Sequence, residues 1–127
     1  MVELSLIINS KITEILRIDK KGLCEEYYTK GLCFGMDEHN KYLVVAVKRC
    51  RLICALLNYE EILTLFPQRD INDPIEADYL EYYLDQKIVS LRFFNDESNS
   101  SKSFFLLNTT GFQLRFDTTG LIDLKNR

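Results

Sequence analysis

Residues 32–66 read LCFGMDEHNKYLVVAVKRCRLICALLNYEEILTLF, two apolar runs followed by the signals of a short helix. Gly31–Met36 and Tyr42–Val47 are separated by a polar turn, which is the pattern of a β-hairpin. Lys48–Arg51 then interrupts the apolar pattern, which resumes over Leu52–Leu57. This spacing favours two strands joined by a tight basic connection, with one long bent strand as the alternative.

A helix is predicted directly after these strands. Asn58 is suited to the N-cap position, and Glu61, three residues further on, completes a capping box in which each side chain satisfies a free backbone N–H. Pro67 ends the helix, because the residue before a proline disfavours helical geometry. The apolar face is supplied by Ile62, Leu63, Leu65 and Phe66.

Much of this pattern returns over residues 91–124, which read LRFFNDESNSSKSFFLLNTTGFQLRFDTTGLIDL. The matched positions are Leu32, Phe34, Asp37, Glu38, Asn40 and Lys41 in the first copy, and Leu91, Phe93, Asp96, Glu97, Asn99 and Lys102 in the second. Further on, Asn58, Ile62, Leu63 and Leu65 match Asp117, Leu121, Ile122 and Leu124. Internal repeats of this kind indicate one supersecondary unit used twice.

The second copy predicts strands over Lys87–Phe94, Lys102–Asn108 and Phe112–Phe116, followed by a final turn of helix that Asp117 caps and that runs through Leu124. The fold class is therefore expected to be α+β. It would consist of two β-rich repeats, about 24–66 and 86–124, each a curved antiparallel sheet followed by a helix. We expect a pseudo-twofold axis between them.

The flanking segments are less regular. Val2–Ile8 is predicted to be a strand, whereas Lys11–Ile18 fits a strand or a helix, and Glu25–Thr29 fits a strand. In the connector 67–85, Asp73 and the proline after it start a second predicted helix that reaches about Asp85, part of which could instead be strand.

Length and composition predict one domain over 1–127 with a sizeable core. No apolar run reaches the length of a membrane span, and Met1–Ile8 lacks the basic flank of a signal peptide. We therefore expect an intracellular protein, nuclear or cytoplasmic, with reduced cysteines and no membrane association. The net charge of −3 is uneven, because residues 52–85 hold 1 basic and 8 acidic side chains.

The segment from Leu32 to Phe66 resembles a repeat of the PUR family, and the two-copy arrangement also resembles the Whirly family. The likeness rests on Phe34, the acidic turn that ends at Asn40, the next strand with Leu43 and Val45, and the Leu57–Glu61 segment that leads into Leu63. It extends more loosely over Leu91–Leu124. The resemblance implies a fold of sheets crossed by helices and the binding of single-stranded nucleic acid.

Binding of single strands requires cations for phosphates and flat groups for bases. Alternation along the strands places Arg92, Phe94, Gln113 and Arg115 on the sheet face opposite the core. The leading expectation is a non-enzymatic module that binds single-stranded DNA or RNA. The phosphates would contact Lys41, Lys48, Arg49, Arg51, Lys102 and Arg115, and bases would stack on Arg92 and Phe94. The alternative reading of these charges is an ordinary solvated face.

Other functions have weaker signals. A protein-interaction module that uses the acidic 60–85 surface is the alternative function, and the apolar positions Cys33, Cys54 and Leu56 require cover from a helix of the chain or from a partner such as a second copy. We expect no cofactor, since the cysteine spacings match zinc motifs only loosely at Cys50 and Cys54. We expect no enzymatic activity, because no phosphate-binding loop or nucleophile elbow is present.

Overall fold

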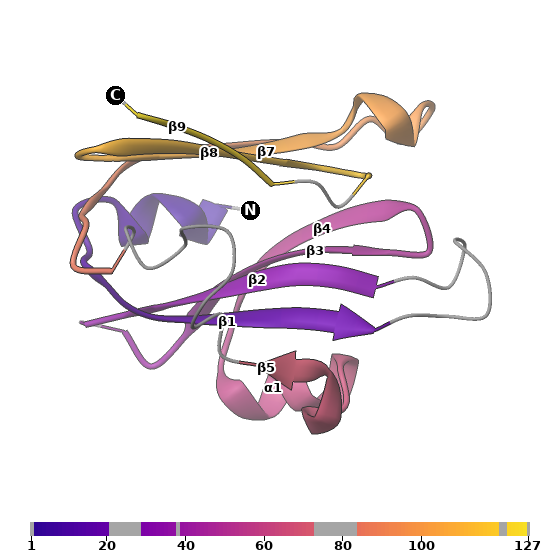
Figure 1. The fold of residues 1–127 in the computed structure, drawn as a ribbon, viewed down its shortest axis with the longest axis horizontal. Coiled ribbons are helices and arrows are strands. Elements are labelled where there is room, and N and C mark those ends of the chain that lie inside the picture. The colour runs from indigo at the N-terminus through magenta and orange to yellow at the C-terminus, as the bar shows by residue number, and fades with distance from the viewer. Residues whose placement is uncertain (1, 21–28, 38, 73–83, 120–121, 127) are drawn as a thin grey trace.

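Two antiparallel β-sheets stack face to face, and helix α1 covers the outer face of one of them (Figure 1). The computed structural model describes residues 2–20, 29–37, 39–72, 84–119 and 122–126. Its elements are η1 (Val2–Ile7), β1 (Ile12–Lys20), β2 (Thr29–Met36), β3 (Tyr42–Lys48), β4 (Arg51–Leu57), α1 (Tyr59–Leu65), η3 (Gln68–Asp70), β5 (Ile71–Asn72), β6 (Ile88–Phe94), η5 (Ser100–Lys102), β7 (Phe104–Thr109), β8 (Phe112–Asp117) and β9 (Ile122–Asn126).

The first sheet has five strands in the order β4-β3-β2-β1-β5, with antiparallel neighbours throughout. The predicted hairpin is confirmed as β2 and β3, and the ambiguous Lys11–Ile18 segment is strand β1. The basic connection is a tight turn between β3 and β4, so the bent-strand alternative is wrong. Arg49 and Cys50 both have positive φ, at 53° and 63°, the combination found in type I′ hairpins, whose twist matches that of the strands.

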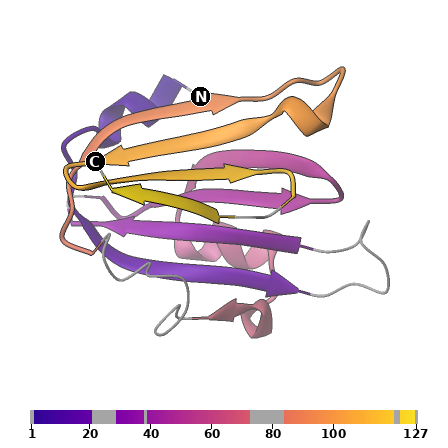
Figure 2. The same ribbon diagram turned by 45° about the horizontal axis from the view of Figure 1, so that its top comes forward.

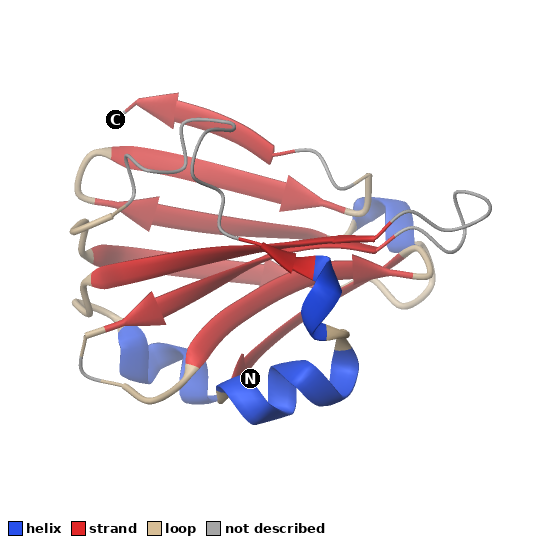
Figure 3. Cartoon of the chain, turned by 60° about the horizontal axis from the view of Figure 1, so that its bottom comes forward, coloured by secondary structure: helices blue, strands red, loops and turns tan. Residues whose placement is uncertain are grey.

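Helix α1 forms as its capping residues predict. Asn58 Oδ1 accepts the Glu61 backbone N–H at 2.8 Å, and the Asn58 N–H donates to Glu61 Oε1 at 3.0 Å, so the capping box is complete. The helix ends at Leu65, ahead of Pro67. It buries Ile62, and Figure 3 shows α1 and η3 lying across the sheet face that points away from the second sheet.

The second sheet is a four-stranded antiparallel meander in the order β6-β7-β8-β9. Strands β6, β7 and β8 confirm the three strands predicted for the second repeat. The predicted helical turn from Asp117 through Leu124 is wrong, because Ile122–Asn126 pairs with β8 as strand β9. Asp117 Oδ1 instead accepts hydrogen bonds from the backbone N–H and the hydroxyl of Thr119, which closes a turn between β8 and β9.

The core has two layers. Between the sheets, a cluster of buried side chains includes Leu32, Phe34, Leu43 and Val45 from the first sheet and Phe105, Leu107, Leu114 and Phe116 from the second. Between the first sheet and α1, a smaller cluster holds Leu16, Ile18, Cys33, Val44, Ala46, Ile62 and Phe66. The first sheet is thus covered on both faces, which is why β2 and β3 are apolar at nearly every position.

The N-terminal strand prediction for Val2–Ile8 is wrong, because this segment forms the 3₁₀ helix η1. Leu4, Ile7 and Ile8 are spaced i, i+3, i+4 and pack against the core between the sheets, a helical spacing rather than an alternating one. The element contacts β4 and β6, the neighbouring edge strands of the two sheets. The burial of these apolar side chains against the core therefore outweighs the strand propensity of residues 2–8.

Two predictions lie outside the described residues. The second helix, from Asp73 to about Asp85, overlaps the undescribed range 73–83, and most of the predicted Glu25–Thr29 strand lies within 21–28. The described segment before β6 connects the sheets: the Ile12 N–H donates to the Gln86 carbonyl at 2.9 Å, and the Asn9 N–H donates to the Ile88 carbonyl at 2.8 Å.

Candidate nucleic-acid interface

An arginine–phenylalanine cluster lies on the outer face of the second sheet. Alternation along β6, β7 and β8 turns one set of side chains into the core and the other set outward. Arg92 and Arg115 are exposed, and their guanidinium carbons lie 5.6 and 4.7 Å from the centre of the Phe104 ring. The Phe94 ring, 44 % exposed, lies 5.7 Å from the Phe104 ring, with an angle of 40° between the planes.

The strand register explains why these side chains meet. Arg92 is opposite Leu106, which is opposite Arg115, and Phe94 is opposite Phe104 in the next row. Directly opposed side chains on one face lie close enough to interact. Guanidinium groups are attracted to the faces of aromatic rings, so Phe104 holds both arginines over the sheet.

A polar row runs beside this cluster on the same face. Gln113 Nε2 donates to Asn108 Oδ1 at 3.0 Å, and Asn108 Nδ2 donates to Ser90 Oγ at 2.9 Å. In the next strand, the exposed Lys125 is opposite Gln113 and extends the row. Among the side chains that the structure describes, the face thus offers three cations, two aromatic rings and a row of amides, with the partly buried Asp117 beside Phe104 as an acidic member.

One of the two aromatic rings and one of the three cations of this face, Phe104 and Lys125, are absent from the predicted set. The sequence of β7 begins with four apolar residues and cannot distinguish Phe104 from Phe105; only the structure shows that Phe105 lies in the core and Phe104 faces outward. Lys125 could not be predicted either, because it joins the face only when β9 forms.

The remaining predicted cations are divided among three places. Lys102 is exposed in η5, within the β6–β7 connection next to the cluster. Arg49 in the β3–β4 turn and Arg51 at the start of β4 are exposed on the other sheet, and the exposed Lys41 lies in the β2–β3 connection. These two connections lie at opposite ends of that sheet (Figure 2). Lys48 points to the α1 side, since its Nζ lies 5.6 Å from the centre of the Phe66 ring and donates to the Leu65 carbonyl. One flat surface cannot include all eight predicted residues.

The three described cysteines and the histidine are dispersed. Cys33 packs in the cluster under α1, so a helix of the same chain covers it. Cys54 and Leu56 pack against the core between the sheets. Burial raises the pKa of both the Cys33 and the Cys54 thiols to about 12. Cys50 is exposed, and His39 Nε2 lies 3.2 Å from Ser10 Oγ. Among the described residues, no group of three or more His, Cys, Asp or Glu side chains is placed to hold a metal ion.

None of the helices found among the described residues has both the length and the apolar character needed to span a lipid bilayer. The chain matches no protein-family model, no curated protein and no solved structure in the comparisons with known proteins.

Proposed function

We propose that the outer face of the second sheet binds single-stranded DNA or RNA. The observation that carries the proposal is the convergence of Arg92 and Arg115 on the Phe104 ring, with Phe94 beside it on an exposed sheet face. Aromatic and guanidinium planes are surfaces on which unpaired bases stack. The amides of Asn108 and Gln113 supply hydrogen-bonding groups next to that platform.

Charge on this face is moderate, and it limits the expected affinity. The phosphate contacts available are Arg92, Arg115, Lys125 and, at the edge, Lys102. Neutralising three or four phosphates of a single strand gives a log–log salt slope of roughly −2 to −3. Raising the salt from about 50 to 200 mM would then weaken binding about 15- to 60-fold. The resemblance to the PUR and Whirly families supports the choice of single strands over duplexes.

The test is fluorescence polarisation with labelled single-stranded DNA and RNA pools at these two salt concentrations. Phe94→Ala removes one stacking surface and should weaken binding by about 5- to 150-fold, the effect of losing one stacked base. Phe94→Tyr keeps the ring and should bind nearly as the parent does. Absence of binding at low salt, where phosphate contacts are strongest, would refute the proposal.

A matched pair of double variants locates the site. Arg92→Gln with Arg115→Gln and Arg49→Gln with Arg51→Gln each remove two positive charges, the first pair on the proposed face and the second in the β3–β4 connection. We expect a large loss of affinity and a shallower salt slope only in the first. Equal losses in both would mean that affinity comes from general charge, and the assignment to this face would be wrong.

We also infer that the two meanders, β2-β3-β4 and β6-β7-β8, are diverged copies of one unit related by a pseudo-twofold axis. In support, the matched pairs Leu32 and Phe34 in β2 and Leu91 and Phe93 in β6 pack toward the same core between the sheets. Only the first copy is followed by a helix among the described residues. The loss of that helix in the second copy would leave one outer sheet face open to a ligand.

Binding of a basic protein to the acidic 60–85 surface is the second candidate function. It is favoured by Glu60 and Glu61, which are exposed at the start of α1, although residues 73–83 of that surface lie outside the described part. Salt-sensitive binding to a cationic protein, together with no binding to oligonucleotides, would favour this function over the first.

A further inference from the structure

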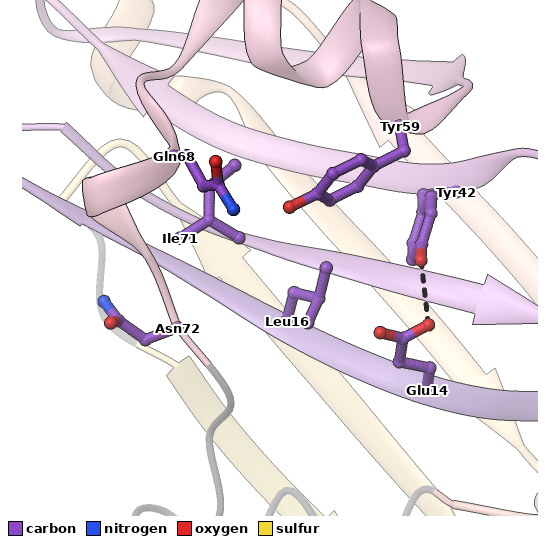
Figure 4. Close-up of a pocket in the computed structure, with 7 residues that line it drawn as sticks. All are labelled: Glu14, Leu16, Tyr42, Tyr59, Gln68, Ile71 and Asn72. Atoms are coloured by element: carbon purple, nitrogen blue, oxygen red, sulfur yellow. Dashed lines mark hydrogen bonds between the residues drawn. The ribbon is translucent and has the colours of Figure 1, made fainter.

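A groove of about 440 Å³ lies between α1 and the first sheet (Figure 4). Helix α1 lies on the face of the first sheet that points away from the second sheet (Figure 1). Its described lining residues come from five elements: Glu14, Leu16, Tyr42, Tyr59, Gln68, Ile71 and Asn72. A volume of this size falls within the range of small-ligand sites. Leu16 belongs to the core cluster under α1, and Ile71 packs against that cluster. The groove therefore has an apolar floor and polar walls.

The tyrosine–glutamate pair in the groove is built by three adjacent strands. Glu14 of β1, Gly35 of β2 and Tyr42 of β3 are direct neighbours across the sheet. A Cβ at position 35 would lie 3.1 Å from Tyr42 Cε2 and 3.2 Å from Glu14 Cβ, closer than side-chain atoms usually approach. Glycine therefore lets the Tyr42 ring lie across β2, where its hydroxyl donates to Glu14 Oε2 at 2.8 Å.

This pair holds a carboxylate at the groove. Burial, together with the hydrogen bond to Glu14, raises the pKa of Tyr42 to about 12, so its hydroxyl remains a donor at neutral pH. The second carboxylate oxygen of Glu14 points into the groove (Figure 4). Among the described residues that line the groove, Glu14 is the one with a charged side-chain type.

Two aromatic rings stand beside this carboxylate. The Tyr42 and Tyr59 ring centres are 6.2 Å apart, with an angle of 50° between the planes. The Tyr59 hydroxyl points toward the Gln68 amide, across the groove from the carboxylate (Figure 4). Aromatic faces attract cations, and a guanidinium combines planar stacking with a fork of donors for a carboxylate.

Three basic residues of the neighbouring elements are placed away from the groove. Lys48 is held over the Phe66 ring, Arg69 is exposed in η3, and Arg17 is a partly buried residue of β1 opposite Asn72. None of the three is among the described lining residues.

We propose that this groove binds the guanidinium group of an arginine side chain presented by a peptide or protein partner. The carboxylate of Glu14 would accept two N–H donors, and the tyrosine rings would contact the guanidinium plane. The site is separate from the proposed nucleic-acid face, since the core between the sheets lies between them. The site would recognise the guanidinium by its positive charge and by its flat shape. A neutral analogue with the same flat shape lacks the charge and should bind more weakly.

The test uses capped tripeptides, acetyl-Gly-Arg-Gly-amide and its citrulline and lysine counterparts, titrated into the 127-residue chain and followed by NMR chemical-shift changes. Citrulline keeps the planar shape and removes the charge. We expect millimolar binding of the arginine peptide and at least tenfold weaker binding of the citrulline peptide. Equal binding of the two, equally tight binding of a lysine peptide, or no binding of the arginine peptide at about 10 mM would overturn the proposal.

Matched variants place the peptide in the groove. Glu14→Gln keeps the side-chain shape and should abolish the preference for arginine over citrulline. Glu60→Gln removes an exposed charge of α1 that does not line the groove, and it should leave that preference intact. If both variants lost the preference for arginine, the preference would come from the overall negative charge of the acidic surface, and the assignment to this groove would be wrong. Because Glu14 is exposed, thermal unfolding should show both variants folded.

Discussion

The capping box of α1 gives a sharp test of how this short helix protects the core beneath it. The helix spans Tyr59–Leu65 and is anchored by the buried Ile62, with Phe66 directly after it. Cys33 of β2 belongs to the same buried cluster and is 0 % exposed. Local opening of α1 should therefore expose the Cys33 thiol while the sheets remain folded.

Asn58→Ala removes the side-chain acceptor of the Glu61 backbone N–H, while the backbone N–H of residue 58 can still donate to Glu61 Oε1. The loss of such a cap costs about 1–2 kcal/mol. If opening and closing are faster than alkylation, the labelling rate of Cys33 follows the population of the open form. It should then rise about 5- to 30-fold, the factor that corresponds to this free energy.

The assay is alkylation under native conditions, with the modified cysteines separated by peptide mass spectrometry. Cys54 is the internal reference, because it packs against the other core and burial raises its pKa to about 12, as it does for Cys33. Asn58→Asp is the matched control, since aspartate also caps helices. An equal rise at Cys33 and Cys54 would mean that Asn58→Ala acts on global unfolding, and no rise at Cys33 would mean that the capping box does not stabilise α1.

Three further predictions concern the turns. Cys50→Gly should raise Tm by about 2–5 °C, because glycine adopts the positive φ of this position without strain, whereas Cys50→Ser should not raise it. Gln86→Ala should lower the free energy of unfolding in urea by about 1–3 kcal/mol, since Gln86 Oε1 accepts hydrogen bonds from Thr109, Thr110 and the Gly111 N–H; Gln86→Glu, which keeps an acceptor there, should lose less. Hydrogen bonds from the Ser98 hydroxyl, and from the backbone of Asn99 and Ser98, lower the pKa of Asp96. The ionised Asp96 therefore stabilises the fold above the ordinary aspartate pKa, and this stability should be lost as the pH falls through the lowered pKa. Urea unfolding of Asp96→Asn should show a smaller loss of stability over the same pH range.

The segments with strong local punctuation could be predicted from the sequence. Asn58, Glu61 and Pro67 specify α1 without help from the rest of the chain, and the polar turn before Tyr42 specifies the hairpin. The alternation of Phe112–Phe116 likewise predicts a strand with one wet face, which is how Arg115 could be assigned to the open side. In each case the local signal and the tertiary environment favour the same structure.

The termini could not be predicted, because their local signals are ambiguous. Asp117 accepts hydrogen bonds from Thr119, two residues after it, and this chemistry serves a helix cap and a turn alike. The free edge of β8 then decides in favour of strand β9, which pairs along it. For η1, contact with β4 and β6 and packing on the core favour the i, i+3, i+4 face of Leu4, Ile7 and Ile8 over the strand propensity of the same residues.

The stacking of the sheets also determines where each proposed site can lie. The first sheet has its two faces occupied, one by the second sheet and one by α1, so its β2 residues Leu32, Cys33 and Phe34 are all 0 % exposed. A ligand can reach this sheet at the border of α1, because the helix is too short to cover the Glu14–Tyr42 side of the face. The second sheet carries no helix on its outer face among the described residues, so Arg92 and Phe94 stand on an open surface. Under the two proposals, charge would select the ligand at each place: the Glu14 carboxylate at the border of the helix would attract a cation, and the arginines on the open face would attract phosphates.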